Sequence, residues 1–396
     1  MINVTKMLYD LDQPMDHLRY GVGADAPRSA KDRKPVVVWN VSRTCNLNCI
    51  HCYADSHNEK YEGELSHEQG IALLDDLAGF GVPAVLLSGG EPLARKDTLE
   101  LAAYGRSIGL KLTLSTNGTL IDLATAQRIK DLGLTYVGIS LDGIGPTNDY
   151  FRGKVGAFDR AVRGIRNCVT VGQKVGLRLT LTPHNVRDLD GIFDFIDKEG
   201  VQRACFYHLV SAGRGRGEVD LSHEDSRKAV DTIIRRTREF VEKGDPREIL
   251  TVDNHADGPY LWMHLLRDDP AAAAKCFELL TWNGGGRFSS GVGIGDIDPQ
   301  GNVHPDQFWQ SVILGNVKER PFSEIWTDPT NDLLAGLRDR LPRLKGRCAT
   351  ASCRFQPQCG GNFRVRAHVA TGDPWEADPA CYLTDQEIAL PVAAAV

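Results

Sequence analysis

Three cysteines stand close together in the first part of the chain, in the run TCNLNCIHCYA. Cys45, Cys49 and Cys52 are separated by three and then by two residues. Thiolates bind iron–sulfur clusters, zinc or copper(I), and a closed zinc site or a simple electron-transfer cluster takes four protein ligands. Three thiolates on one loop instead fit a cubane cluster whose fourth iron stays open to a small molecule. A zinc knuckle, or three unrelated core cysteines, is the less specific interpretation.

A second group of cysteines lies in the carboxy-terminal tail and supplies four thiolates, from Cys348, Cys353, Cys359 and Cys381. Four ligands complete a metal site, so the tail predicts either a [4Fe–4S] cluster or a tetrahedral zinc ion. The three cysteines that remain are isolated, and we interpret them as small buried hydrophobic residues: Cys168, Cys205 and Cys276.

The composition of the 396-residue chain is that of an ordinary globular protein. Its formal net charge of −6 gives no broad attraction to nucleic acid or to an anionic membrane. No stretch approaches the roughly 18 apolar residues that span a bilayer, and the amino terminus has no apolar signal core. We therefore expect a cytoplasmic protein whose ten cysteines serve metal or redox chemistry rather than disulfides.

Short apolar runs alternate with helical patterns from about residue 35 onward. The predicted strands are 36–40, 84–89, 111–117, 136–142, 175–181 and 204–210. The predicted helices are 66–80, 122–133, 158–171, 186–199, 221–243 and 260–280. Six strand–helix repeats are two short of a closed barrel, so the sequence predicts an α/β fold with a partial (βα)6 TIM-like barrel.

Changes in composition and in the pattern of predicted elements divide the chain into four predicted parts. They are an amino-terminal extension (1–34), the partial barrel (35–212), a helical connecting region (213–290) and an auxiliary iron–sulfur cluster domain (291–396). In such barrels the chemistry lies at the carboxyl ends of the strands. The cysteine triad directly follows the first predicted strand, so we expect it on that face.

The triad, with Tyr53 directly after it, resembles the radical S-adenosylmethionine (SAM) superfamily. The resemblance implies that three cysteines hold a [4Fe–4S] cluster and that its open iron takes the amino and carboxylate groups of SAM. It also implies a contact to the SAM amino group from Ser88, Gly89, Gly90 and Glu91, a run that alone could be a simple Gly-Gly turn. Groups that could contact the ribose come from Ser115, Asn117, Ser140 and Asp142.

Arg178 is a charged residue inside an otherwise apolar predicted strand. Buried arginine is rare unless it is paired. Its partner is either the SAM carboxylate or a structural carboxylate, Asp142 or Glu91.

The tail resembles the SPASM/Twitch domains of the same superfamily, with one departure. Four residues separate Cys348 from Cys353, where the family normally has two. A second auxiliary cluster would need further cysteines, but Asp306 and Phe363 stand in two of their expected places. The resemblance therefore implies one auxiliary cluster, which relays electrons, and two [4Fe–4S] clusters in the whole protein.

Stretches along the whole chain, among them TVDNHADGPY and GDPWEADPACYLTD, resemble the alternative haem biosynthesis enzymes. The deacetylase (AhbC) family removes two acetate side chains from 12,18-didecarboxysirohaem and yields Fe-coproporphyrin III. The related NirJ family removes propionates on the way to d-type haem. A SPASM peptide maturase is a weaker alternative, because only about 34 residues precede the barrel; a non-enzymatic iron–sulfur protein is the weakest, because it needs neither SGGEP nor an incomplete triad.

An iron-containing tetrapyrrole with several carboxylates would need cationic contacts and a ligand for its iron. Arginine pairs bidentately with carboxylates, and the candidates are Arg214, Arg216, Arg364 and Arg366. Imidazole commonly binds haem iron. The histidine candidates are His208 and His255, with His304 in the hairpin near residue 300. We further expect a low-potential electron donor such as flavodoxin or ferredoxin.

Overall fold

A single sheet of eleven strands runs through the computed structural model, which describes residues 1–12, 16–20, 33–217 and 220–389. Its spatial order is β1-β8-β7-β6-β5-β4-β3-β2-β9-β10-β11. The strands are β1 (Ile2–Asn3), β2 (Val36–Asn40), β3 (Val85–Ser88), β4 (Leu112–Thr116), β5 (Val137–Ser140), β6 (Val175–Leu181), β7 (Arg203–His208), β8 (Glu248–Val252), β9 (Ile294–Ile297), β10 (Asn302–His304) and β11 (Gly315–Asn316).

The six strands predicted from the sequence are confirmed as β2 to β7, which pair in parallel and in sequential order. The parallel sheet is wider than predicted, because β8 adds to β7 and β9 adds to β2. The short strands β1, β10 and β11 pair antiparallel at the two ends. The architecture is therefore a partial barrel of six strand–helix units, extended on both sides.

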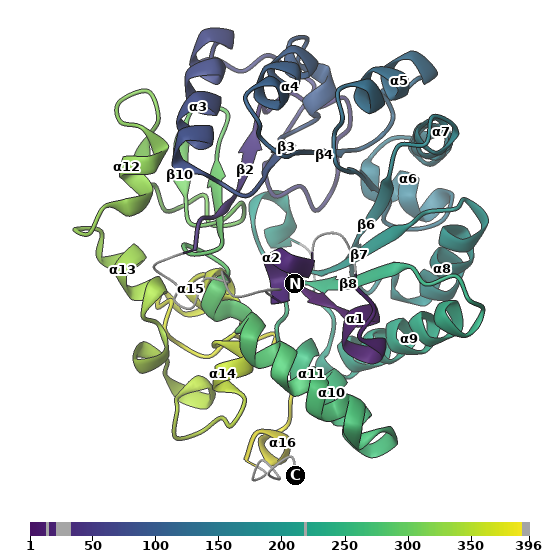
Figure 1. Cartoon of the computed structure of the whole chain (residues 1–396), viewed down its shortest axis with the longest axis vertical. Helices are drawn as coiled ribbons and strands as arrows, with labels where there is room; N and C mark the ends of the chain where they lie inside the picture. Colours follow the sequence, from purple (N-terminus) through teal and green to yellow (C-terminus); the bar gives the residue numbers. More distant parts are fainter. Residues whose placement is uncertain (13–15, 21–32, 218–219, 390–396) are drawn as a thin grey trace.

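Helices connect the parallel strands and surround the outside of the curved sheet (Figure 1). Those of the barrel and its flanks are α1 (Val4–Tyr9), α2 (Asp16–Tyr20), α3 (His67–Phe80), α4 (Thr98–Ser107), α5 (Leu123–Asp131), α6 (Pro146–Arg152), α7 (Ala157–Thr170), α8 (Leu189–Lys198) and α9 (His223–Glu242). A capping box begins α3, where the Ser66 hydroxyl accepts from the Gln69 amide and the Gln69 side chain accepts from the Ser66 amide.

The helix predicted over 260–280 is wrong in one respect: it is two helices. They are α10 (Asp257–Asp268) and α11 (Pro270–Asn283), and the chain turns between them at Asp269. Pro270 cannot donate a backbone hydrogen bond and therefore occupies the first turn of a new helix, which the Asp269 carboxylate caps. The tail adds α12 (Phe322–Thr327), α13 (Asp332–Arg338), α14 (Gln356–Cys359), α15 (Arg364–Thr371) and α16 (Asp385–Ala389).

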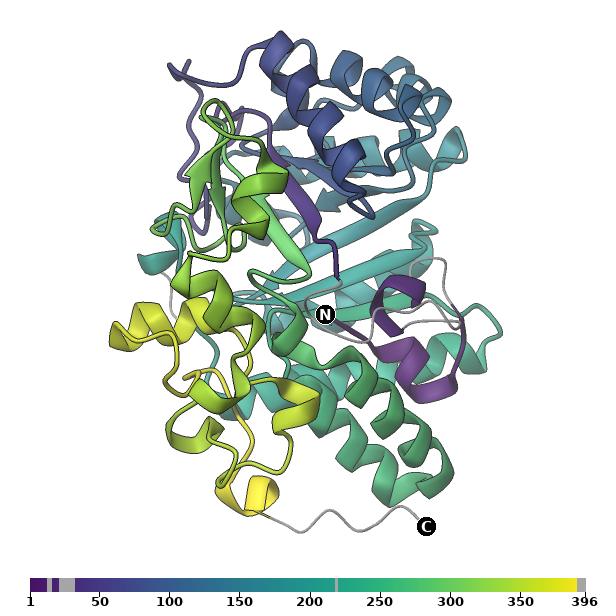
Figure 2. The ribbon, with the colours of Figure 1, turned by 60° about the vertical axis from the view of Figure 1, so that its left-hand side comes forward.

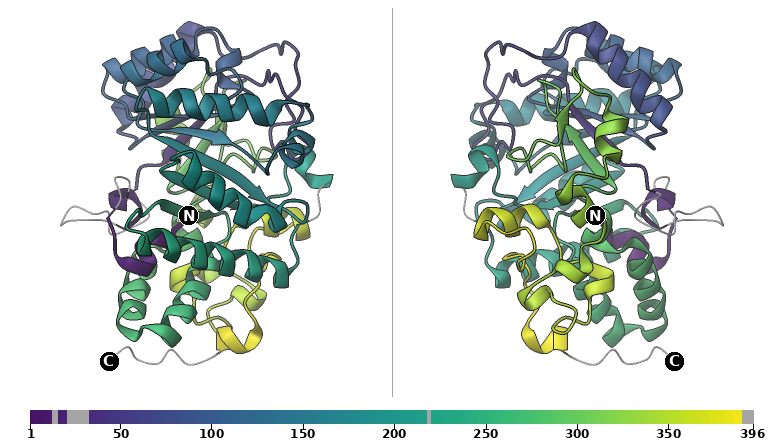
Figure 3. Two further views of the ribbon diagram at one scale, coloured as in Figure 1. Left: turned by 90° about the vertical axis from the view of Figure 1, so that its right-hand side faces the viewer. Right: turned by 90° about the vertical axis from the view of Figure 1, so that its left-hand side faces the viewer.

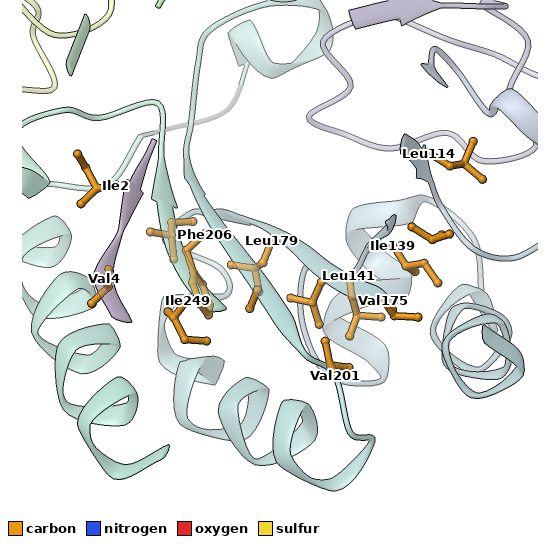
Figure 4. Packing of buried hydrophobic residues seen from close by; sticks show 14 of the residues in the cluster. Ile2, Val4, Leu114, Ile139, Leu141, Val175, Leu179, Val201, Phe206 and Ile249 are labelled. Atoms are coloured by element: carbon orange, nitrogen blue, oxygen red, sulfur yellow. The ribbon is translucent and has the colours of Figure 1, made fainter. Parts of the chain in front are cut away.

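The two faces of each strand carry different side chains. On β6, Leu177, Leu179 and Leu181 are fully buried, and their hydrophobic cluster also contains Phe206 and Ile249 of the next two strands (Figure 4). Successive side chains point to opposite faces of a strand. Arg178 and Thr180 therefore face the interior of the barrel, where they line a cavity.

The carboxy-terminal segment lies at one end of the molecule, beside α10 and α11 (Figures 2 and 3). The sheet is continuous across the predicted domain boundaries, since β1 pairs with β8 and β9 pairs with β2. The four domain ranges remain a prediction. Among the residues that the structure describes, no helix is both long and apolar enough to cross a membrane.

Candidate active site

The cysteine triad lies on the loop that leaves the carboxyl end of β2, as the sequence predicted. The Cys45 amide donates to the His57 carbonyl at 2.9 Å and closes this loop, here called the cluster loop (residues 41–57). Each sulfur accepts at least one hydrogen bond: Cys45 from the Leu47 amide (3.5 Å) and Nδ2 of Asn117 (3.9 Å), Cys49 from Arg152 Nη1 (3.6 Å) and Cys52 from the Ser56 amide (3.5 Å). Donors directed at thiolates stabilise a bound cluster and set its potential.

A cavity of about 150 Å³ adjoins the three cysteines at the carboxyl ends of the strands. Nearly every residue predicted to contact SAM lines it: Tyr53, Ser88, Gly89, Gly90, Ser115, Asn117, Ser140, Asp142 and Arg178. Three thiols on one side and polar groups on the other fit a cluster with an open position that faces a polar ligand. We call this cavity the SAM pocket.

The Gly89–Gly90 turn packs directly against the cluster loop. A Cβ atom at Gly90 would lie 2.4 Å from the Arg43 carbonyl oxygen, so only glycine fits there.

Glu91 differs from its prediction, because it is fully buried behind the SAM pocket. Its carboxylate accepts from the Thr116 hydroxyl (2.7 Å) and the Asn117 amide (2.8 Å), so it fixes the turn after β4.

Asp142 is the centre of a buried ionic network beside the cluster. Its carboxylate accepts from Arg152, and it lies 3.2 Å from Nε2 of His51. Burial alone would raise the pKa of Asp142, but Arg152 and His51 hold it at about 2. Because Arg152 also reaches the Cys49 sulfur, this network connects the end of β5 to the cluster loop.

Arg178 has neither of the structural partners that the sequence left open. Asp142 is paired with Arg152, and Glu91 is bonded to the turn after β4. The Arg178 guanidinium instead lies over the Tyr207 ring, 4.9 Å from its centroid. Within the described ranges it has no ion pair, so a cation faces the SAM pocket without a counter-ion and its role as the SAM carboxylate contact remains a prediction.

Arg214 holds the cluster loop and lines the SAM pocket, and its predicted contact with substrate remains a prediction. Its Nε donates to the Cys49 carbonyl at 2.8 Å, and the rest of the guanidinium reaches Asp55 and the Ser56 carbonyl. A Cβ at the preceding Gly213 would lie 2.3 Å from the Cys52 carbonyl oxygen. The segment after β7 therefore closes over the cluster loop.

A chain of hydrogen bonds leads from the SAM pocket to the carboxy-terminal hairpin. The Tyr53 hydroxyl lies 3.3 Å from the Ser88 hydroxyl and donates to Asn40 at 2.9 Å. The Asn40 amide in turn donates to Asp296 at 2.9 Å. Burial raises the pKa of Asp296 to about 8; among its charged neighbours, His304 opposes this rise and Asp298 and Asp306 add to it.

This protonated carboxyl makes stability depend on pH. The folded protein keeps the Asp296 proton up to about pH 8, whereas an unfolded chain loses it near pH 4, so the free energy of unfolding falls as pH rises across this range. The Asp296→Asn variant has no ionisable group at this position, so its free energy of unfolding should lack this contribution to the fall. At about 1.4 kcal/mol per pKa unit, the contribution reaches several kcal/mol. Urea unfolding of both proteins between pH 5 and pH 8 measures the difference; parallel curves would contradict it.

The four cysteines of the tail are neighbours in the structure. Burial raises the pKa of Cys359 well above its usual value, and Cys381, Cys348 and Cys353 each raise it further. No three His, Cys, Asp or Glu side chains of the described ranges are arranged to hold one metal ion between them. The two extra residues before Cys353 thus leave the four thiols together, and the auxiliary cluster remains a prediction.

A second and larger cavity, of about 440 Å³, fills the barrel interior toward the amino-terminal ends of the strands. Residues at the starts of strands line it, among them Val36, Arg203 and Ile294. It shares a wall with the SAM pocket, formed by Val38, Leu86, Arg178, Tyr207 and Gln307. We call it the lower cavity. The sequence predicted chemistry at the carboxyl ends of the strands but no cavity at the opposite ends.

The two histidine candidates have different surroundings. Nε2 of His208 is hydrogen-bonded to the Asp257 carboxylate at 3.0 Å, and the ring stacks on Tyr382. This ring nitrogen is therefore already engaged. His255 lines the lower cavity with a side chain that makes no hydrogen bond in the described structure, and its buried Nδ1 has no partner. Burial lowers the pKa of His255 well below its usual value, so the imidazole is neutral.

The arginines of α15 are engaged inside the protein, and their predicted contact with substrate remains a prediction. Arg364 is fully buried and donates to the carbonyls of Pro374 and Glu376. Arg366 is 4% exposed and pairs with Asp378 at 3.0 Å. Arg216 is exposed on the short 3-10 helix Gly213–Gly217. Nδ1 of His304 donates to the Val312 carbonyl at 2.7 Å and its Nε2 lies 3.4 Å from the Asp298 carboxylate, so His304 holds the hairpin.

Several residues of the site were missed in the sequence. Gln307 and Phe308 follow β10 and reach the SAM pocket, where Phe308 packs edge-on against Tyr53 at 5.5 Å. Asp253 directly follows β8, has a backbone in the left-handed region (φ 65°) and lines the lower cavity. Burial raises the pKa of Asp253 to about 6, which suits a group that exchanges a proton near neutral pH.

Comparison with known proteins gives consistent findings. A model of the Radical SAM superfamily matches residues 39–196. The Fe-coproporphyrin III synthase of Methanosarcina barkeri is 55% identical over 398 residues, 98% of this chain and 99% of that protein. The pre-heme d1 synthase of Dinoroseobacter shibae is 47% identical over 91% of this chain and 89% of that one.

Among solved structures, Streptococcus suis SuiB bound to its precursor peptide SuiA has a TM-score of 0.70. It is 18% identical in sequence and the match covers 89% of this chain and 76% of SuiB. At that identity the likeness concerns the fold, namely a barrel with a carboxy-terminal extension.

Proposed function

This chain belongs to the radical SAM superfamily, in the group that contains Fe-coproporphyrin III synthase and pre-heme d1 synthase, and we propose that it forms Fe-coproporphyrin III by removing two acetate side chains from 12,18-didecarboxysirohaem. The observation that carries the proposal is the 55% identity to a protein named for that product, over nearly the full length of both chains. The predicted resemblance to alternative haem biosynthesis enzymes is thereby confirmed.

Membership in the superfamily implies one [4Fe–4S] cluster and SAM. Together they supply hydrogen abstraction from the substrate by radical chemistry. Cys45, Cys49 and Cys52 hold the cluster in our proposal, and the residues that line the SAM pocket hold SAM. Arg178, the unpaired cation of that pocket, binds the SAM carboxylate.

The substrate occupies the lower cavity in this proposal. Its volume of about 440 Å³ lies within the range of small-molecule sites, and the wall that it shares with the SAM pocket brings substrate next to SAM.

We propose that His255 binds the iron of the tetrapyrrole. A neutral imidazole without a protein partner, at the wall of the cavity, is the ligand that such an iron needs. His255→Ala should change the absorption spectrum of the bound iron tetrapyrrole and weaken its binding by roughly 100-fold, the upper end of what the loss of an outer-shell partner costs.

Added imidazole controls for a structural effect, because it can replace the missing ligand only if the ring binds iron. Recovery of the original spectrum in His255→Ala is therefore the expected result. An unchanged spectrum in the variant before imidazole is added would remove His255 from the site.

We propose a second [4Fe–4S] cluster at Cys348, Cys353, Cys359 and Cys381, because the Cys359 thiol lies close enough to the other three that each raises its pKa. A cluster with four protein ligands has no open iron, so it relays electrons from a donor such as flavodoxin or ferredoxin. All ten cysteines are free thiols, which supports a place in the reducing cytoplasm.

One alternative has a specific observation in its favour. The 47% identity to pre-heme d1 synthase, again over most of both chains, favours removal of propionates from the same class of substrate. Both reactions would use the same two cavities, and they differ only in which side chain meets SAM.

Mass spectrometry of an anaerobic reaction separates the two. Reconstituted protein, SAM, dithionite and didecarboxysirohaem should give a product that has lost two acetates, together with 5′-deoxyadenosine. Loss of propionates would favour the alternative. Cleavage of SAM with an unchanged tetrapyrrole would refute both substrates and keep the radical chemistry.

A further inference from the structure

Five cationic side chains line the lower cavity: Arg19, Arg33, Lys34, Arg178 and Arg203. Two of them are neutralised within the protein. Arg19 and Arg203 both pair with the buried Glu248, at 3.1 and 3.2 Å. Lys34 is exposed and lies over the Phe80 ring. Arg178 belongs to the wall shared with the SAM pocket, which leaves Arg33 as the cation to explain.

Arg33 is held in place by aromatic rings rather than by a carboxylate. Its guanidinium lies 3.8 Å from the centroid of Phe288 and 4.9 Å from that of Trp282. Its Nε is buried and makes no hydrogen bond, and the described ranges contain no ion pair to it. Burial, together with Arg287, lowers the pKa of Arg33 to about 10, so the group stays charged at neutral pH without a counter-ion.

The position of Arg33 gives this charge a use. It directly precedes β2 at the amino-terminal end of the barrel, whereas the SAM pocket lies at the carboxyl ends of the strands. Stacking on flat rings restricts the rotamers of arginine and leaves the edge of the fork, with its N–H donors, for a ligand. A carboxylate accepts two parallel hydrogen bonds from that edge.

We propose that Arg33 binds a peripheral carboxylate of the substrate, at the end of the lower cavity away from SAM. This inference rests on the proposed function, because it supposes a carboxylated tetrapyrrole in that cavity. Arg33 then takes the role that the sequence assigned to Arg364 and Arg366, both of which are engaged inside the tail. By anchoring one edge of the ring, it determines which edge turns toward the SAM pocket.

The test measures binding of Fe-coproporphyrin III to the reconstituted protein by absorbance titration. Arg33→Gln should raise the dissociation constant roughly 10- to 100-fold, the usual effect of losing a charged hydrogen-bond partner. Arg287→Gln is the matched control: it removes a charge beside the same Phe288 ring (5.1 Å), but Arg287 is exposed and does not line the cavity. Its binding should equal that of the wild type.

The tetramethyl ester of Fe-coproporphyrin III gives a second readout, which loss of folding could not imitate. The ester has no carboxylates, so wild type and Arg33→Gln should bind it with equal affinity. Equal affinity of the two proteins for the free acid would overturn the role of Arg33 while leaving the proposed function intact. Failure of the wild type to bind the free acid would instead overturn the proposed function itself.

Discussion

Cys49→Ala should reduce reductive SAM cleavage to the background of a reaction without protein. Cys49 is one of three thiols that face the SAM pocket, and the Arg152 guanidinium reaches its sulfur at 3.6 Å. A cluster held by Cys45, Cys49 and Cys52 would keep only two protein ligands in this variant and would be bound less firmly, and the buried Arg152 loses an acceptor. The measurement is 5′-deoxyadenosine formed under dithionite, together with iron bound per chain.

Cys168→Ala provides the control for this prediction. Cys168 is fully buried in α7, belongs to neither group of cysteines, and its pKa is raised to about 12 by burial, as expected of an inert thiol. The same substitution there should leave cleavage and iron content close to wild type, at a cost of about 1 kcal/mol in stability. Full cleavage activity in Cys49→Ala would rule out the proposed cluster.

Arg366→Met should lower the free energy of unfolding by roughly 3–5 kcal/mol, the usual cost of leaving one member of a buried ion pair alone. Arg366 pairs with the fully buried Asp378, and it also donates to the carbonyls of Leu209 and Asp253. It thereby joins the ends of β7 and β8 to the segment that precedes Cys381. Chemical denaturation of the reconstituted protein measures the loss.

Arg343→Met is the matched control for Arg366→Met. Arg343 is exposed and lies 5.4 Å from the Trp375 ring centroid, so its substitution should cost less than about 1 kcal/mol. If the orphaned carboxylate causes the loss, Asp378→Asn in the same chain should recover part of it. Equal stability of Arg366→Met and Arg343→Met would contradict the structural role assigned to the α15 arginine.

The parts of the fold that the sequence predicted are those with local signals. Apolar runs and caps defined six strands and most barrel helices, and cysteine spacing defined the cluster loop. The strand β8 was missed because EILTV lies between a charged stretch and a polar motif, and its neighbour β7 is more than forty residues away in the chain. The break at Pro270 was visible, yet the apolar pattern continued across it.

Charge type alone did not show which arginines are buried. Arg364 and Arg366 look like surface cations in CGGNFRVRA, and only tertiary structure shows that they are buried against carbonyls and Asp378. Arg33 gave no signal, because its aromatic partners lie some 250 residues later. Likewise, the lower cavity arises from inward-facing residues of many strands, none of which forms a motif.

The contact between Arg214 and the cluster loop also sets an order of events during synthesis. Arg214 bonds to Cys49 across 165 positions of the chain. At the usual rate of about 5–20 residues per second, the ribosome makes the three cysteines on the order of 10–30 s before it makes Arg214. During that interval the segment that carries Arg214 does not yet cover the nascent cluster loop, and the assembly machinery of the cell can reach all three thiols. We therefore expect delivery of the cluster to be easiest while the polypeptide is still growing.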